Sequence, residues 1–337
     1  MGIKGLTKTI TKYSPESITH ENLYKLSGKK VAVDASLILY QQLLKSPGKI
    51  FKNSKGQITS HITGVFYKFM NYISLSIDII FIFDGKPPVN KQECINQRKE
   101  KSKKAKEAAL NSTCEEEKEK LEKSSLRLTK EMIDDVKKLL TLMGISYIHP
   151  EVGEGEGYAS ELCRMGYVDY VLTEDMDTMA YGCPKLIRNC IDRSIRRKDI
   201  VSIFDYSKLM SDIELTHEQF LDFCILCGCD YCPIVPKIGN VTAMKLIKKH
   251  NCIETIIDET SEKYEFPENY LTIFNEAKLN FKVFMGKLTL DDININIKTG
   301  QRDIEGLSSF LINDIEMNEK RVQNSLKKFH NNYNASK

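Results

Sequence analysis

Residues 79–84 read Ile79-Ile80-Phe81-Ile82-Phe83-Asp84, an apolar run that stops at a carboxylate. The same pattern recurs in Val31-Ala32-Val33-Asp34 and in the segment from Tyr170 to Asp177. Short runs of β-branched and aromatic residues are typical of parallel strands that are buried on both faces. We therefore predict an α/β fold with a mostly parallel central sheet and helices on both of its faces.

Carboxylates are the second feature of these runs. In open α/β sheets the functional site lies beyond the carboxyl ends of the strands, so acids placed there converge. Several ionised acids share one cleft only if cations offset their repulsion. Hard oxygen ligands without nearby histidine suit Mg²⁺ or Mn²⁺ and indicate metal-assisted chemistry on phosphate. Seven acids in five short clusters are candidates: Asp34, Asp84, Glu154, Glu156, Asp175, Asp177 and Asp230.

Any one of these acids could instead be a helix N-cap or a turn residue, because acids are common at both places. The spacing within the pairs sets a further condition. Residues i and i+2 of a regular helix point about 200° apart. Glu154 and Glu156 therefore serve one site only if they straddle a helix start, which the neighbouring glycines permit. Asp175 and Asp177 need only an extended segment, where alternate residues face the same way.

The composition is that of an ordinary soluble protein. The 337 residues are 41% hydrophobic and 28% charged, with a net charge of +3. This balance does not by itself indicate a nucleic-acid binder, but residues 98–106 hold six basic residues and one acid. No apolar stretch approaches the length needed to span a membrane, and the N-terminus lacks the apolar core of a signal peptide. We expect an intracellular protein that does not act in a membrane.

Ten cysteines are scattered along the chain, and reduced thiols are the default without a secretory signal. Cys224, Cys227, Cys229 and Cys232 form two C-x-x-C units, which would suggest zinc or an iron–sulfur cluster. A single residue separates the two pairs, whereas zinc modules usually separate them by a loop. The first pair also falls in the amphipathic segment 220–226, so packing in the core is the favoured interpretation.

The segment from Lys91 to about Lys130 is rich in Lys, Glu, Ala and Leu, which predicts helices with a sparse apolar face. Within it, Lys123, Arg127 and Lys130 are spaced i, i+4 and i+7 and would share one helix face. Lys91 and Arg98 are seven apart and could align as well. A solvated charged hairpin is the alternative. The segment begins seven residues after a strand-end acid, so its cations could reach a phosphate held by the metals.

A pair of helices is predicted further on. Thr216-x-x-Gln219 is a capping box that opens a helix running to Leu226. Residues 228–239 form a loop, and 241–250 form a second helix with a basic end. A helix, a glycine-containing turn and a second helix commonly hold the backbone of a duplex, although many globular proteins contain such a pair.

Five stretches carry a resemblance: Met1-Gly2-Ile3-Lys4-Gly5-Leu6, Val33-Asp34-Ala35-Ser36, Phe83-Asp84-Gly85-Lys86-Pro87-Pro88, Thr173-Glu174-Asp175-Met176-Asp177 and Gly228-Cys229-Asp230-Tyr231-Cys232. In order and spacing they resemble the flap endonucleases, a branch of the structure-specific 5′ nucleases that also include the xeroderma pigmentosum G type. The resemblance covers nearly the whole chain. It implies a PIN-like 5′ nuclease fold with a helical arch and a helix-turn-helix region that binds duplex DNA.

The resemblance also implies an activity. A flap endonuclease hydrolyses phosphodiesters of branched DNA that carries a 5′ flap, by a two-metal-ion mechanism that leaves 5′-phosphate ends. Such an enzyme also has 5′-3′ exonuclease activity and acts in DNA replication and repair. A mainly exonucleolytic enzyme and an inactive DNA-binding scaffold are the alternatives. The intact seven acids argue against the scaffold. A monomer in the nucleus, or at a viral replication site, is expected.

The resemblance assigns roles to individual residues. Asp34, Asp84, Glu154 and Glu156 would mainly hold one Mg²⁺ ion, which Mn²⁺ could replace, and Asp175, Asp177 and Asp230 the other. Lys91 and Arg98 match the catalytic cations at the base of the arch, and Tyr40 matches an aromatic residue that stacks on a nucleobase. DNA contacts are implied for Gly2, Tyr40, Lys68, Lys123, Arg127, Lys130, Glu154, Gly228, Asp230 and Gly239.

The chain departs from the family pattern in the turn after Asp230. Only the second glycine of the usual Gly-Ile-Gly is kept, as Gly239, and Ile234 replaces a serine that helps to hold K⁺. A weak K⁺ site would then rest on the backbone carbonyls of Ile234, Val235 and Ile238. The tail that docks family members on the sliding clamp has no counterpart in the residues up to Lys337, so recruitment by the clamp stays open.

These patterns divide the chain into five expected regions. They are the N-terminal nuclease region (1–90), the arch (91–130), the internal nuclease region (131–215), the duplex-binding region (216–255) and a C-terminal helical region (256–337).

Overall fold

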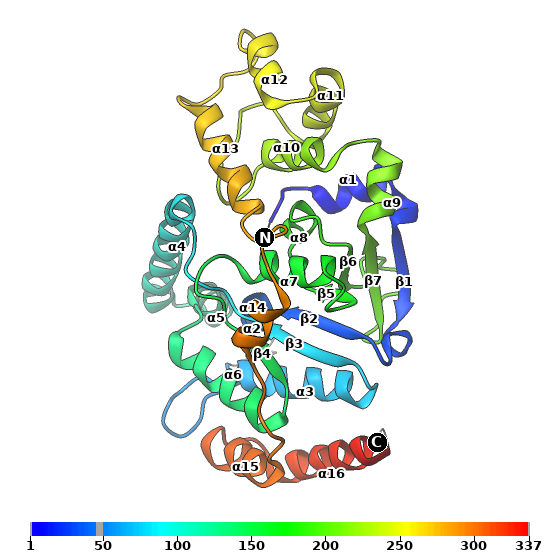
Figure 1. Ribbon diagram of the computed structural model, residues 1–337. Coiled ribbons are helices and arrows are strands. Elements are labelled where there is room, and N and C mark those ends of the chain that lie inside the picture. The colour runs from blue at the N-terminus through cyan, green and yellow to red at the C-terminus, as the bar shows by residue number, and fades with distance from the viewer. Residues whose placement is uncertain (1, 45–49, 336–337) are drawn as a thin grey trace.

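An eight-stranded sheet runs through the centre of the computed structural model, which describes residues 2–44 and 50–335 and side chains as far as Phe329 (Figure 1). The strand order is β1-β7-β6-β5-β2-β3-β4-β8. The strands are β1 (Ile18–Asn22), β2 (Lys30–Asp34), β3 (Asp78–Ile82), β4 (Ser146–Ile148), β5 (Tyr170–Leu172), β6 (Lys185–Asn189), β7 (Ile200–Asp205) and β8 (Ile297–Lys298).

The centre of the sheet is parallel. Strands β6, β5, β2, β3 and β4 pair in parallel, and β1, β7 and β8 add antiparallel edges. The carboxyl ends of β2, β3 and β5 therefore lie at one edge of the sheet, as expected from the apolar runs. The predicted mostly parallel sheet is confirmed.

Alternate residues of the central strands face opposite layers. Val31 and Val33 of β2 belong to a cluster with α3 (Ser60–Ser74) and α6 (Lys130–Met143). Ala32 between them belongs to a second cluster, with Tyr158 of α7 (Gly155–Arg164). Burial on both faces explains why β2 and β3 read as continuous apolar runs and not as alternating ones.

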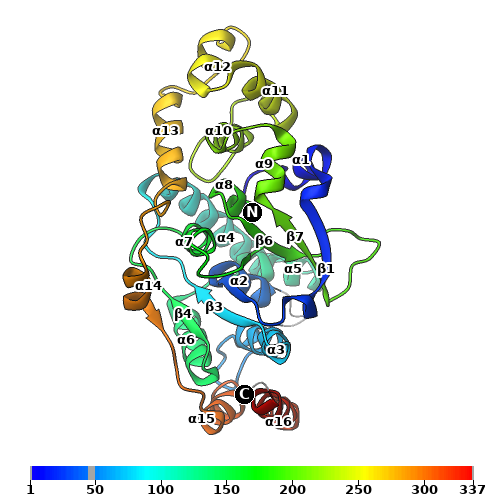
Figure 2. The ribbon, with the colours of Figure 1, turned by 45° about the vertical axis from the view of Figure 1, so that its right-hand side comes forward.

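Further helices cover both faces of the sheet. The last helices of the chain lie under α3 and α6 at the foot of the molecule (Figure 2). These last helices are α15 (Ile304–Ser309) and α16 (Glu319–Ala335). The other covering helices are α1 (Leu6–Tyr13), α2 (Ala35–Leu44), α8 (Asp177–Ala180), α9 (Tyr206–Ile213) and α14 (Leu290–Asn296). None of the helices in the described ranges is long and apolar enough to cross a membrane.

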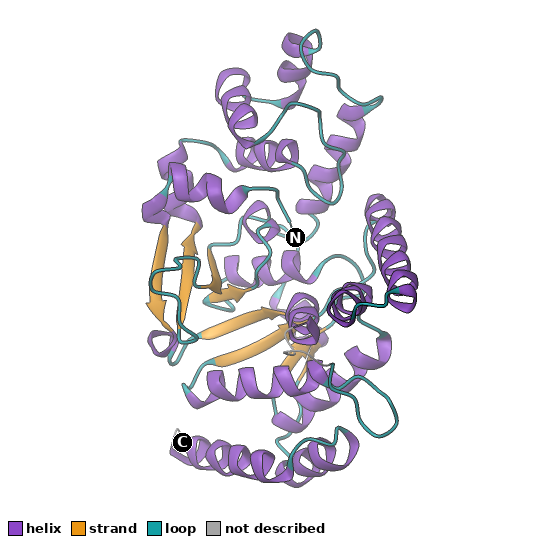
Figure 3. Ribbon diagram, turned by 180° about the vertical axis from the view of Figure 1, so that it is seen from behind, coloured by secondary structure: helices purple, strands orange, loops and turns teal. Residues whose placement is uncertain are grey.

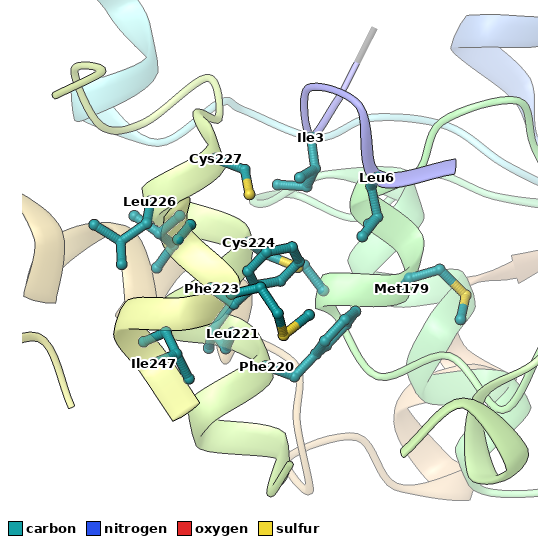
Figure 4. Packing of buried hydrophobic residues seen from close by; sticks show 14 of the residues in the cluster. Ile3, Leu6, Met179, Phe220, Leu221, Phe223, Cys224, Leu226, Cys227 and Ile247 are labelled. Atoms are coloured by element: carbon teal, nitrogen blue, oxygen red, sulfur yellow. The ribbon is translucent and has the colours of Figure 1, made fainter. Parts of the chain in front are cut away.

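A helical module packs on the opposite end of the sheet. It consists of α10 (His217–Cys227), α11 (Asn240–His250), α12 (Ile253–Thr260) and α13 (Tyr270–Phe281). Phe220, Phe223 and Cys224 of α10 pack with Leu6 of α1 and Met179 of α8 (Figure 4). The capping box of Thr216 and Gln219 is present at the start of α10, as predicted.

The arch is a pair of helices, α4 (Gln92–Asn111) and α5 (Glu115–Ser125), which stand beside the sheet (Figure 3). The predicted common face of Lys123, Arg127 and Lys130 is wrong. Helix α5 ends at Ser125, so Arg127 lies in the link to α6 and Lys130 is the first residue of α6. Helix periodicity does not extend across this break.

His61 of α3 is fully buried, and neither of its ring nitrogens has a side-chain hydrogen-bond partner among the described residues. Burial lowers the pKa of His61 from 6.5 to about 4. Because the folded state binds the proton less tightly than the unfolded state, the contribution of His61 to stability is complete above pH 6.5 and is lost as the pH falls toward 4.

We expect the protein to lose about 2 kcal/mol of unfolding free energy through His61 between pH 7.5 and pH 5. Urea unfolding of the wild type and of His61→Leu at both pH values measures this loss, since leucine cannot take up the proton. An equal pH dependence in the two proteins would contradict the assignment.

Candidate active site

All seven acids predicted from the sequence line one cleft of about 510 Å³ between the sheet and the arch. Lys91, Arg98, Tyr40 and Arg127 line it as well. The complete lining is Asp34, Ser36, Leu37, Tyr40, Asp84, Lys91, Arg98, Lys101, Ser102, Ser124, Leu126, Arg127, Leu128, Glu154, Glu156, Asp175, Asp177 and Asp230. The cleft therefore combines a strongly acidic floor with basic residues from the arch.

Two of the acids lie where parallel strands end. Asp34 is the last residue of β2 and is held by the backbone N–H of Leu37 at 3.1 Å and the hydroxyl of Thr173 at 2.8 Å. Asp84 follows β3 by two residues and accepts a hydrogen bond from the N–H of Gly155 at 2.8 Å. Asp34 and Asp84 thus have fixed orientations before any cation binds.

Glu154 and Glu156 straddle a helix start, which is the condition for both to face one site. Glu154 is the N-cap of α7, with an extended backbone at φ −94° and ψ 142°, and Glu156 lies in the first turn. Between them, a Cβ on Gly155 would lie 3.0 Å from the carbonyl oxygen of Ile82. Glycine therefore lets α7 begin directly against β3.

The predicted extended geometry of Asp175 and Asp177 is wrong. Strand β5 ends at Leu172, and Asp177 is the first residue of the short helix α8. A turn holds the pair, because the N–H of Asp177 donates to Asp175 at 3.1 Å. Asp177 also accepts from the N–H of Ile3 at 2.6 Å, so the N-terminal segment supports the site.

Gly2 lies against the same two acids. Its φ is +83°, a conformation that favours glycine, and an added Cβ would lie 1.8 Å from the Oδ1 of Asp175. Any larger residue would displace this carboxylate. Only the family resemblance pointed to Gly2, because Asp175 and Asp177, which it contacts, are more than 170 residues away in the sequence.

Burial and electrostatic repulsion oppose ionisation at the cleft floor. Burial, and then the neighbouring carboxylate of Asp84, raise the pKa of Asp34 to about 7. Burial and the charge of Asp175 raise the pKa values of Glu156 and Asp177 well above the ordinary range. Such a cluster binds a cation well, because the cation relieves the repulsion.

Lys91 and Arg98 supply part of the compensating charge. Lys91 lies at the end of a short 3₁₀ helix (Val89–Lys91) and pairs with Glu154, with Asp230 3.4 Å away. Arg98, two turns along α4, holds both oxygens of Asp230 at 2.8 Å. Although burial opposes it, these two cations lower the pKa of Asp230 below its ordinary value.

The donor set fits a divalent cation. Glu156, Asp175 and Asp177 each offer a carboxylate oxygen, and these oxygens lie within 4.8 Å of one another. Among the side chains that the structure describes, as far as Phe329, this is the one group of three or more His, Cys, Asp and Glu residues with such spacing. Oxygen-only ligands are those that Mg²⁺ and Mn²⁺ prefer. The group joins Glu156 to the two aspartates that the resemblance gave to the other ion.

The sequence reasoning missed several arch residues that reach the cleft. Lys101, Ser102 and Ser124 line it, and the hydroxyl of Ser102 donates to the carbonyl of Ser125 at 2.6 Å, which ties α4 to α5. The spacing could have revealed Lys101. It stands three residues after Arg98, so the two share a helix face.

Other predicted DNA contacts lie outside the cleft lining. Lys123 and Lys130 do not line it, and Lys68 of α3 lies over the rings of Phe69 and Tyr72, 5.7 and 6.0 Å from their centroids. Gly228 ends α10 with φ +104°. Gly239 is the N-cap of α11, and no atom lies within 4 Å of a Cβ added there.

The three residues of the suggested K⁺ site form a tight turn before α11. The carbonyl of Val235 already accepts the N–H of Ile238 at 3.2 Å. Lys237 in this turn has φ +67°, a left-handed conformation that costs a non-glycine residue roughly 1–2 kcal/mol. Cys224, Cys227 and Cys232 of the neighbouring C-x-x-C units are buried in the hydrophobic cluster of α10, without disulfide partners.

The chain is similar to known nucleases along most of its length. The model of the XPG N-terminal domain matches residues 1–105, and that of the XPG I-region matches residues 144–230. The chain is 36% identical over 335 residues to Flap endonuclease 1 of Glycine max, covering 97% of this chain and 86% of that protein. It is also 36% identical to Flap endonuclease 1 of Entamoeba histolytica, covering 98% and 88%.

Solved structures agree with this picture. Flap endonuclease-1 from Methanococcus jannaschii is 28% identical, with a TM-score of 0.70 over 95% of this chain and 97% of that one. The catalytic core of Rad2 in complex with a DNA substrate has a TM-score of 0.68 over 97% and 99% of the two chains. At 22% identity, this second likeness speaks for the fold alone.

Proposed function

Since this chain belongs to the flap endonuclease family, within the XPG-type nucleases, we propose that it is a structure-specific, metal-dependent endonuclease that cuts DNA carrying a 5′ single-stranded flap. The observation that carries the proposal is the cleft, where seven carboxylates meet the cations of Lys91 and Arg98 under a helical arch. The family relationship and the chemistry of the cleft are independent supports for it.

The chain's own residues divide the work. Two divalent cations held by the acidic floor would supply Lewis-acid stabilisation of the attacking and leaving oxygens. Lys91 and Arg98 would stabilise the charge that builds on the scissile phosphate. Tyr40 lines the cleft from α2 and would stack on an unpaired base near the cut. Products should carry 5′-phosphate and 3′-hydroxyl ends.

Specificity should follow DNA shape. The basic arch would hold the single strand, and the turn between α10 and α11 would hold duplex backbone through amides and the N-terminus of α11 at Gly239. Mg²⁺ is the proposed physiological ion, with Mn²⁺ as a substitute. A role in nuclear DNA replication and repair, as a monomer, completes the proposal.

A labelled double-flap substrate tests the function directly. We expect cleavage near the base of the 5′ flap in Mg²⁺ or Mn²⁺, no cleavage in EDTA, and much slower digestion of nicked or blunt duplex. Sequencing gels that map both product ends identify the bond broken. Release of mononucleotides from blunt ends as the main product would favour an exonuclease, and tight DNA binding without cleavage in either metal would favour a scaffold.

A further inference from the structure

Behind the acidic floor, two tyrosine hydroxyls form a chain that ends on Glu154. The hydroxyl of Tyr231 donates to Oε2 of Glu154, and the hydroxyl of Tyr181 lies 3.1 Å from that of Tyr231. Both tyrosines are 3% exposed. Tyr231 directly follows Asp230, and Tyr181 directly follows α8, which begins at Asp177. The hydrogen-bonded tyrosines therefore connect the segments that carry Asp177, Asp230 and Glu154.

The chemistry of the carboxylate and the two hydroxyls determines which oxygen donates in each hydrogen bond. A carboxylate paired with Lys91 only accepts, so the single hydroxyl proton of Tyr231 points to Glu154. The contact between the tyrosines is then made by the proton of Tyr181, which points to the oxygen of Tyr231. Hydrogen bonds in such a chain polarise one another, so the hydroxyl of Tyr181 strengthens the bond that Tyr231 makes.

Packing fixes both rings. Phe281 of α13 contacts both, with its ring centroid 4.9 Å from that of Tyr181 and 5.2 Å from that of Tyr231. The position of Glu154 at the start of α7 is therefore tied to the helical module through aromatic contacts. Neither hydroxyl reaches the cleft lining, so the tyrosines act through Glu154.

Glu154 is held from two sides. Oε1 pairs with Lys91, and Oε2 accepts from Tyr231. If Lys91 serves a phosphate during the reaction, its pairing with Glu154 weakens. Tyr231 then remains as the contact that keeps this carboxylate turned toward the floor of the cleft. A ligand side chain whose orientation is fixed in advance binds a cation more tightly than a mobile one.

We propose that Tyr231 and Tyr181 are positioning residues that hold Glu154 in the orientation needed to bind a divalent cation. The inference rests on the proposed function for its consequence in catalysis, but the effect on metal binding stands without DNA. The hydroxyl of Tyr231 acts on the carboxylate directly, and that of Tyr181 acts through Tyr231.

Mn²⁺ binding to the full chain without DNA provides the test, because the paramagnetic resonance signal of free Mn²⁺ reports binding independently of activity. We expect Tyr231→Phe to weaken Mn²⁺ binding about tenfold and Tyr181→Phe by a smaller factor. Both substitutions keep the rings that pack on Phe281. In cleavage assays, the variants should need more Mg²⁺ to reach half-maximal rate and should recover at high Mg²⁺.

The matched control is Tyr158→Phe. Tyr158 lies on α7 itself, is 2% exposed, and its hydroxyl has no hydrogen-bond partner among the described residues. This variant should bind Mn²⁺ like the wild type, and thermal unfolding should show that all three variants fold. Wild-type Mn²⁺ affinity in folded Tyr231→Phe would overturn the proposal, as would failure of the wild type to bind Mn²⁺. If the wild type binds Mn²⁺ but does not cleave a flap substrate, the proposed function is refuted and the positioning role of the tyrosines is not.

Discussion

Asp177→Asn should reduce cleavage of a flap substrate by on the order of 10³-fold or more, while DNA binding persists. Asparagine keeps the shape of the side chain and can still accept the N–H of Ile3, but it removes a charge from the group that fits a divalent cation. Single-turnover cleavage at saturating protein measures the chemical step, and gel mobility shifts in Ca²⁺ measure binding.

The same variant should unfold at a higher temperature than the wild type. Asp177 is buried beside Asp175, and its pKa lies well above the ordinary range because burial and that neighbour oppose its charge. At neutral pH the unfolded chain ionises this carboxyl freely and the folded state opposes its ionisation, which costs folding free energy. Asparagine does not ionise and carries no such cost, so stability rises as activity falls, a trade-off common at active sites. Asp199→Asn is the control, since Asp199 is half exposed and outside the cleft. Substantial cleavage by Asp177→Asn would contradict the metal assignment.

Lys91→Ala should slow cleavage by about 10²- to 10³-fold, the loss typical of removing one group that stabilises charge in a transition state. Mn²⁺ binding should become tighter in Lys91→Ala, whereas the loss of a carboxylate in Asp177→Asn should weaken it. Lys91 pairs with Glu154 and lies close to Asp230, so removing it leaves Glu154 without its cation and Asp230 with Arg98 alone, which favours a metal ion in its place. Single-turnover rates and Mn²⁺ titration separate the two effects.

Lys103→Ala provides the matched control for Lys91. Lys103 lies on α4, the arch helix that follows Lys91, is exposed, and does not line the cleft. Its ion-pair partner is Glu107 on the same helix, 4.0 Å away. Its loss should leave the single-turnover rate and the Mn²⁺ affinity near wild-type values. Equal losses in Lys91→Ala and Lys103→Ala would indicate a general effect of arch charge and would refute the specific role of Lys91.

The core of the sheet could be predicted because strands buried on both faces must be apolar throughout. The edge strands escaped, since β1 reads Ile-Thr-His-Glu-Asn and carries no such run. The placement of Asp34 and Asp84 followed from the strand ends. The turn of Asp175 and Asp177 did not, because it depends on hydrogen bonds to their own backbone and to Ile3.

The arch shows a second limit of sequence reasoning. Its composition predicts helix, but composition does not reveal the break at residues 126–129 that separates Lys123 from Lys130. The tyrosine chain behind Glu154 was also out of reach. Tyr181 and Tyr231 are 50 residues apart, and tertiary packing, which includes the contact of Phe281 with both rings, brings their hydroxyls together.

The pairing of β1 with β7 bears on how the protein is made. Residues 18–22 cannot form their strand pairing until residues 200–204 have been synthesised, and the acidic floor of the cleft is incomplete until Asp230 has been added. At the usual pace of translation, about 10 to 40 s separate the emergence of β1 from that of Asp230. A growing polypeptide on the ribosome therefore has an incomplete active site, and nuclease activity can develop only after most of the chain has been translated.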